Sequence, residues 1–141
     1  NASVYYVVRF VGYVMVGYNA IGSIGPALAF TTLAGISIIY WMYIRKNKFD
    51  WPQAMVYTLT IYFLMSTTVH PWYLGMMVAL SVLSFQVYPL IWTYLIFLSY
   101  SHYQGGHFEE NYYLIGLEYL LLFGCMWWEN KWKKKSLLAA A

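Results

Sequence analysis

Charged residues are scarce in this chain. Eight Lys/Arg and five Asp/Glu make up 9% of the 141 residues, against about 25% in a typical soluble domain. So few charges cannot cover the surface of a water-soluble globule of this size, and a hydrophobic content of 62% is incompatible with intrinsic disorder. The single cysteine, Cys125, excludes an internal disulfide and is expected to be a small buried hydrophobic residue. The composition therefore predicts an integral membrane protein.

Long apolar runs dominate what is present. They predict an all-α fold, a polytopic transmembrane helical bundle that forms one membrane domain over residues 1–141. Gly25-Pro26 suits a helix start, and the run that contains it stops at Arg45-Lys46-Asn47-Lys48. Trp and Tyr crowd the ends of the runs, as in the aromatic belt of a membrane protein. About five spans are expected, over 20–44, 53–69, 72–86, 89–103 and 112–128.

The stretch 72–103 contains no Lys, Arg, Asp or Glu and can form one long span or two short ones. Two spans place Arg45-Lys46-Asn47-Lys48 and the lysine-rich tail, 129–141, on the same side of the membrane. One span places them on opposite sides, against the positive-inside rule. Pro89 also favours a break, because proline lacks a backbone donor and clashes with the preceding turn. We therefore expect two short spans, which imply a thinned bilayer or burial in a larger bundle, and a cytoplasmic tail.

The first segment, 1–19, differs from the others because its apolar run is short and carries Arg9 at its middle. An arginine at the centre of a bilayer costs about 2.5–3.5 kcal/mol on insertion scales. The segment is therefore expected to be an external helix, either interfacial or re-entrant. Arg9 would then either bind a phosphate bidentately or reach ordinary lipid headgroups.

Two further side chains lie near the external ends of the predicted spans. Pro71 restricts His70 to an extended conformation, so its imidazole is expected on a tight turn, where it can donate to a phosphate or sugar hydroxyl or bond to the turn backbone. Glu118 lies about six residues inside the last span, and an intramembrane carboxylate is a functional-site hypothesis by default. It can pair with Arg9, accept sugar hydroxyls, or be protonated against a tyrosine.

No metal or cofactor site is predicted. His107, Glu109 and Glu110 have suitable atoms but no recognised ligand spacing, and the two adjacent carboxylates are expected to cap the following helix. The lysine-rich tail is expected to contact anionic lipids of the inner leaflet rather than nucleic acid.

Three strings occur in order along the chain: NASVYYVVRFVGYVMVGYNAIGSIGP, TTVHPWYL and FEENYYLIGLEYLL. Over nearly all of its length the chain resembles the C-terminal part of bacterial multi-pass mannosyltransferases of the GT-C type, most closely members from Bacteroidetes. The resemblance implies transfer of mannose from a polyprenyl-phosphate sugar, on the outer face of the bacterial inner membrane, to a glycan or lipid acceptor. The residues expected to bind this donor are Arg9, His70, Asn19, Glu118, Asn111 and Tyr6.

One feature of that family has no counterpart here. Its members are several times longer and carry a catalytic Asp or Glu base in an outer loop near the N-terminus. The sequence starts at Asn1 without an initiator methionine, so we expect a fragment of a longer chain that is inactive alone. Two alternatives remain open: a non-catalytic small membrane subunit of a larger complex, and part of a transporter for a lipid-linked sugar.

Overall fold

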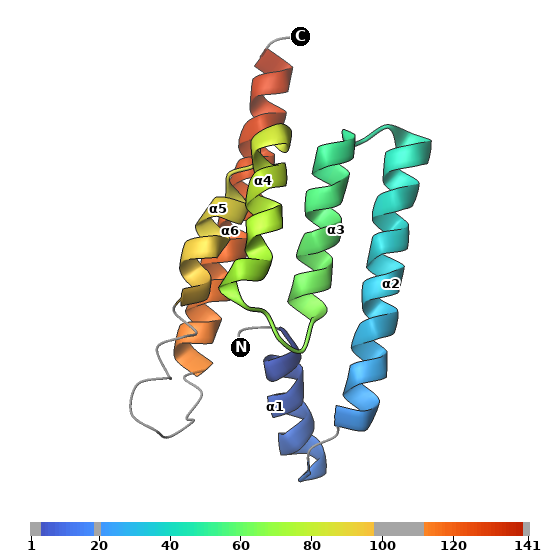
Figure 1. Ribbon diagram of the computed structural model, residues 1–141, viewed down its shortest axis with the longest axis vertical. Helices are drawn as coiled ribbons and strands as arrows, with labels where there is room; N and C mark the ends of the chain where they lie inside the picture. The colour runs from blue at the N-terminus through green and yellow to red at the C-terminus, as the bar shows by residue number, and fades with distance from the viewer. Residues whose placement is uncertain (1–3, 19–20, 98–111, 140–141) are drawn as a thin grey trace.

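The computed structural model describes residues 4–18, 21–97 and 112–139 (Figure 1). Within those ranges the regular structure is entirely helical, in agreement with the predicted all-α class. The elements are α1 (Val4–Val16), α2 (Ile21–Lys46), α3 (Trp51–Met65), the 3-10 turn η1 (Pro71–Tyr73), α4 (Leu74–Ser84), α5 (Tyr88–Leu95) and α6 (Tyr112–Ala139).

Helices α2 to α6 alternate in direction along one common axis (Figure 1). Each of these helices packs on the next one in sequence, including α5 on α6, whose connection lies outside the described residues. Helix α1 lies at one end of the bundle, against α2 and α3. The loop from α2 to α3 and the C-terminal half of α6 share the opposite end, where the Tyr57 hydroxyl donates to Asn130 Oδ1 at 3.1 Å. Because of this alternation, both basic clusters of the sequence lie at the same end of the bundle.

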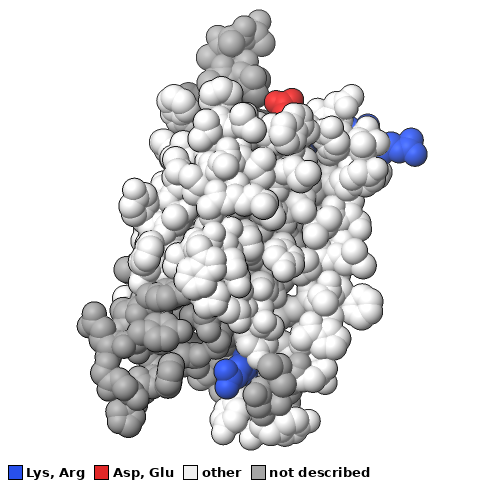
Figure 2. Space-filling view, viewed as in Figure 1, with Lys and Arg blue, Asp and Glu red and all other residues white. Residues whose placement is uncertain are grey.

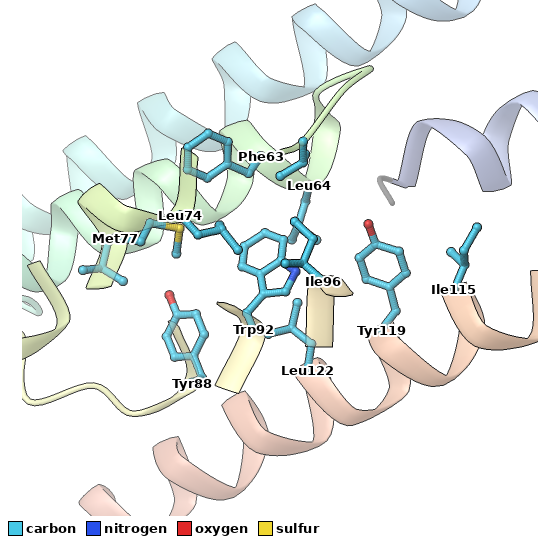
Figure 3. Close-up of a cluster of buried hydrophobic side chains, with 12 residues drawn as sticks. Phe63, Leu64, Leu74, Met77, Tyr88, Trp92, Ile96, Ile115, Tyr119 and Leu122 are labelled. Atoms are coloured by element: carbon cyan, nitrogen blue, oxygen red, sulfur yellow. The ribbon is translucent and has the colours of Figure 1, made fainter. Parts of the chain in front are cut away.

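The hydrophobic core lies between α3, α4, α5 and α6 (Figure 3). Trp92 of α5 is at its centre, fully buried among Leu64, Ile96 and Leu122. Helix α2 contributes little to this core, since Leu28 and Ile39 are its only buried hydrophobic residues among those described. It packs instead along α3, where a methyl group added to Gly35 would lie 3.0 Å from Ile61 Cδ1. The absence of a side chain at Gly35 thus permits the close approach of α2 and α3.

Among the described residues, one helix, over Gly22–Lys46, is long and apolar enough to cross a membrane. At about 1.5 Å per residue, the 15, 11 and 8 residues of α3, α4 and α5 fall short of the hydrocarbon core of a bilayer, about 30 Å thick. On the face shown in Figure 2, charged atoms appear near the two ends of the described part and none appears across the middle. Large apolar side chains such as Phe30 and Leu33 of α2 and Val82 of α4 are exposed.

The expected break within 72–103 is confirmed. Helix α4 ends at Ser84, its C-cap residue Phe85 adopts a left-handed conformation (φ 52°), and the Gln86 backbone amide donates to Ser81 O at 3.1 Å. Left-handed backbone costs a non-glycine residue roughly 1–2 kcal/mol, so the turn needs support from elsewhere. Pro89 lies in the first turn of α5, where its missing amide is harmless.

Other boundaries differ from those expected. Helix α2 starts at Ile21, so Pro26 lies inside it rather than at its start. Helix α3 ends at Met65, four residues before the predicted end, because the Ser66 hydroxyl bonds to Thr68 O at 3.0 Å and redirects the backbone into a turn. Helix α5 ends at Leu95, whereas α6 continues through the basic tail to Ala139.

Candidate functional site

The turn that carries His70 lies at the end of the bundle opposite the basic clusters (Figure 1). His70 is extended (φ −101°, ψ 149°), as Pro71 predicts, and the Tyr73 amide donates to its carbonyl at 3.0 Å. Val69 is fully buried and anchors the turn in the core. The sequence therefore holds this imidazole on a rigid turn rather than on a helix face.

The His70 ring stacks on Trp72, with centroids 4.3 Å apart and planes within 7°. His70 is half-buried, whereas 68% of the Trp72 side chain is exposed. Tyr73 meets the imidazole edge-on at 5.3 Å. An imidazole held in this way can present a hydrogen-bond donor to an anion, and the indole beside it offers an apolar face to a ligand.

Arg9 lies near the middle of α1, as predicted from sequence, and is half-buried. The helix is held by Tyr5, which is 4% exposed, and by Gly12, where an added methyl group would come within 3.0 Å of Ile24. Phe10, Tyr13 and other apolar side chains of α1 remain exposed. The guanidinium is thus carried by an anchored helix at the same end of the bundle as His70 (Figure 1).

Glu118 is fully buried, and Trp92 Nε1 donates to its Oε1 at 3.2 Å. Burial of a charged or polar group is costly unless the group is hydrogen-bonded, so this contact ties α6 to the central tryptophan of α5. The neighbouring Tyr119 hydroxyl is buried and has no hydrogen-bond partner among the described residues. The roles predicted for Glu118 did not include this contact with Trp92 of another helix.

The remaining candidates are only partly described. Tyr6 lies within α1, while Asn19 and Asn111 lie outside the described residues, as do His107, Glu109 and Glu110. In the part of the chain that the structure covers, no three His, Cys, Asp or Glu side chains are grouped so as to hold a metal ion.

Sequence reasoning missed the role of Glu129, which it treated as the start of the tail. The Glu129 carboxylate is 7% exposed and accepts the Val87 amide with both oxygens and the Tyr88 amide with Oε2, each at 3.1 Å. It therefore caps α5 from a different helix. The sequence did hold a signal for Glu129: it follows Glu118 by eleven residues, or about three helical turns, so both carboxylates share one face of the helix.

A groove of about 740 Å³ at the basic end was also missed. Helix α3 contributes five residues to it over Gln53–Leu64, with α2 and α6 on either side. The sequence held no local signal for this feature, since its walls come from three separate helices.

Searches of protein-family models, curated proteins and solved structures find no match to this chain.

Proposed function

We propose that this chain is a multi-pass membrane region, with α2 to α6 crossing the bilayer and α1 lying at its outer interface. The observation that supports this most strongly is the alternation of the five helices, which gathers seven of the eight basic residues of the sequence at one end. By the positive-inside rule that end faces the cytoplasm. The short helices α3, α4 and α5 then need a locally thinned bilayer or burial against neighbours.

Within this arrangement, we propose that the opposite, outer end binds a polyprenyl-phosphate sugar as the donor side of a GT-C-type glycosyltransferase in a bacterial inner membrane. Arg9 and His70 would donate to the phosphate, whose charge develops as the sugar leaves. Asn19, Asn111 and Tyr6 are the candidates for contacts with sugar hydroxyls. The sequence resemblance supports mannose as the sugar, with a glycan or lipid acceptor and a catalytic base in an N-terminal outer loop.

The buried position of Glu118 modifies this proposal. A side chain that is fully enclosed and bonded to Trp92 positions α5 and α6 and does not need to touch the sugar. The same observation favours a second candidate, a non-catalytic membrane subunit, in which such contacts serve packing alone. The two candidates differ in one measurable property, namely binding and transfer of a lipid-linked sugar.

Orientation in the membrane is tested by cysteine labelling from outside the cell. In a Cys125→Ser background, Thr67→Cys and Lys48→Cys place one thiol at each end of α3, and both positions are exposed in the structure. An impermeant maleimide applied to intact bacterial spheroplasts should label Thr67→Cys and leave Lys48→Cys unlabelled until the membrane is permeabilised. Labelling of both thiols in intact spheroplasts would contradict the crossing of the membrane by α3, and the reverse pattern would invert the topology.

Donor binding is tested in the intact protein with a radiolabelled polyprenyl-phosphate mannose. Loss of a hydrogen bond to the charged phosphate is expected to lower transfer about tenfold or more for Arg9→Ala and for His70→Ala. Arg45→Ala removes an equal charge at the opposite end, in the last turn of α2, and should leave transfer unchanged. Undiminished transfer in both outer-end variants would refute the assigned roles, and no transfer by the unmodified intact protein would favour the subunit.

A further inference from the structure

The groove at the basic end is distinct from the proposed donor site, which lies at the other end of the bundle. Its volume, about 740 Å³, falls within the range of small-molecule sites, roughly 300–1,000 Å³. Helix α3 forms its floor through side chains that recur three or four residues apart, so they share one face of the helix. Its lining residues include Ile39, Met42, Lys48, Gln53, Ile61 and Asn130.

The groove is amphipathic along its length. Lys48, Gln53 and Asn130 lie at the basic end of the bundle, whereas Ile39, Ile61 and Leu64 lie farther along α2 and α3. From Gln53 to Leu64 the helix advances about 16 Å. A ligand that fits has a polar, anionic head at the basic end and an apolar chain that follows α3 away from it.

The backbone holds Lys48 at the mouth of this groove. Asn47, just after the end of α2, adopts a left-handed conformation (φ 45°), and the Lys48 backbone amide donates to Met42 O at 3.3 Å. The Lys48 ammonium lies 5.6 Å from the centre of the Phe49 ring. Lys46, two residues earlier, instead lies over Trp41, 4.6 Å from its ring centre, and does not line the groove.

The charge at this end favours an anion. Seven Lys/Arg of the sequence lie in or beside the α2–α3 loop and in the second half of α6, against two carboxylates, Asp50 and Glu129. Glu129 is engaged by the amides of α5. Juxtamembrane basic residues attract anionic lipids of the inner leaflet.

We infer that this groove binds one anionic phospholipid, with its phosphate at Lys48 and Gln53 and one acyl chain along Ile39, Ile61 and Leu64. The inference goes beyond the proposed function and shares with it only the location in a membrane. The basic end would then hold one lipid at a defined site, in addition to the general attraction of its basic residues to anionic lipids of the inner leaflet.

The test uses the purified chain, delipidated in a mild non-ionic detergent, and native mass spectrometry of bound lipid. Phosphatidylglycerol and phosphatidylcholine with identical acyl chains are titrated separately. We expect phosphatidylglycerol to bind about tenfold more tightly, because the choline cation of phosphatidylcholine offsets the charge of its phosphate and is repelled by Lys48. Lys48→Gln should remove this preference, whereas Lys46→Gln, which deletes the same charge outside the groove, should retain it.

A second pair of variants tests the apolar part of the site. Met42→Trp places a large ring in the groove and should abolish tight binding of phosphatidylglycerol. Ile38→Trp is the control, since it adds the same ring at an exposed position that does not line the groove. This control should bind phosphatidylglycerol as tightly as the unmodified chain does. Equal binding of the two lipids, or equal losses in Lys46→Gln and Lys48→Gln, would overturn the inference. Displacement of the lipid by glycerol 3-phosphate would also overturn it, because that result indicates a simple anion site. None of these outcomes depends on sugar transfer, so failure here is distinguishable from failure of the proposed function.

Discussion

Replacement of Trp92 by alanine is expected to give the largest loss of stability in this chain, about 3–5 kcal/mol. The side chain is the largest of those that are fully buried, and it contacts residues of three helices in the core (Figure 3). Its removal leaves a cavity among α3, α5 and α6. The cavity term of the loss persists in detergent, since packing rather than the transfer of apolar surface from water holds helices together there.

The measurement is the midpoint of unfolding in mixed micelles with increasing denaturing detergent, followed by far-UV circular dichroism. Trp51→Ala is the matched control because that ring is 54% exposed at the start of α3, and it should change stability by no more than about 0.5 kcal/mol. Trp92→Phe is expected to fall between the two, because it keeps most of the volume and removes the indole donor to Glu118. Equal losses in Trp92→Ala and Trp51→Ala would show that this core is not the packed centre of the bundle.

Replacement of Glu129 by alanine is expected to have the second largest effect, a loss of roughly 2–4 kcal/mol. Two backbone amides at the start of α5, those of Val87 and Tyr88, lose their carboxylate acceptor in a partly or fully buried setting. Unsatisfied buried donors are costly, and the negative charge that complements the N-terminal end of the α5 dipole is lost as well. Helix α5 has only eight residues, so it has little internal stability with which to offset this loss.

Amide hydrogen exchange at Val87 and Tyr88 gives a local readout of this cap. Exchange at both amides should accelerate in Glu129→Ala and should change less in Glu129→Gln, which keeps one carbonyl acceptor. Asp50→Ala is the control, since it removes an exposed carboxylate that precedes α3 and should cost about 1 kcal/mol, typical of a helix N-cap, without altering exchange in α5. Unchanged exchange at Val87 and Tyr88 in Glu129→Ala would refute the capping role.

The sequence predicted the burial and the partners of these residues to different degrees. The position of Trp92 in a stretch without charged residues does not by itself predict that it lies at the centre of the core, because the six other tryptophans of the chain are each at least half exposed. Glu118 was recognisable as an unusual intramembrane carboxylate, although its partner came from a helix 26 residues away. Glu129 was assigned to the cytoplasmic tail, because its partners lie more than 40 residues away in sequence.

The sequence by itself determined the helical class, the approximate order of the helices, the break between α4 and α5 and the extended backbone of His70. These features are local: they follow from apolar run length, from the placement of proline and from charge counted along the chain. Tertiary structure decided that Glu129 caps α5 and that Glu118 accepts from Trp92. It also decided that α6 continues through the basic tail and that α2, α3 and α6 enclose a groove. Those outcomes depend on distances between separate helices, which neither residue type nor spacing along one helix specifies.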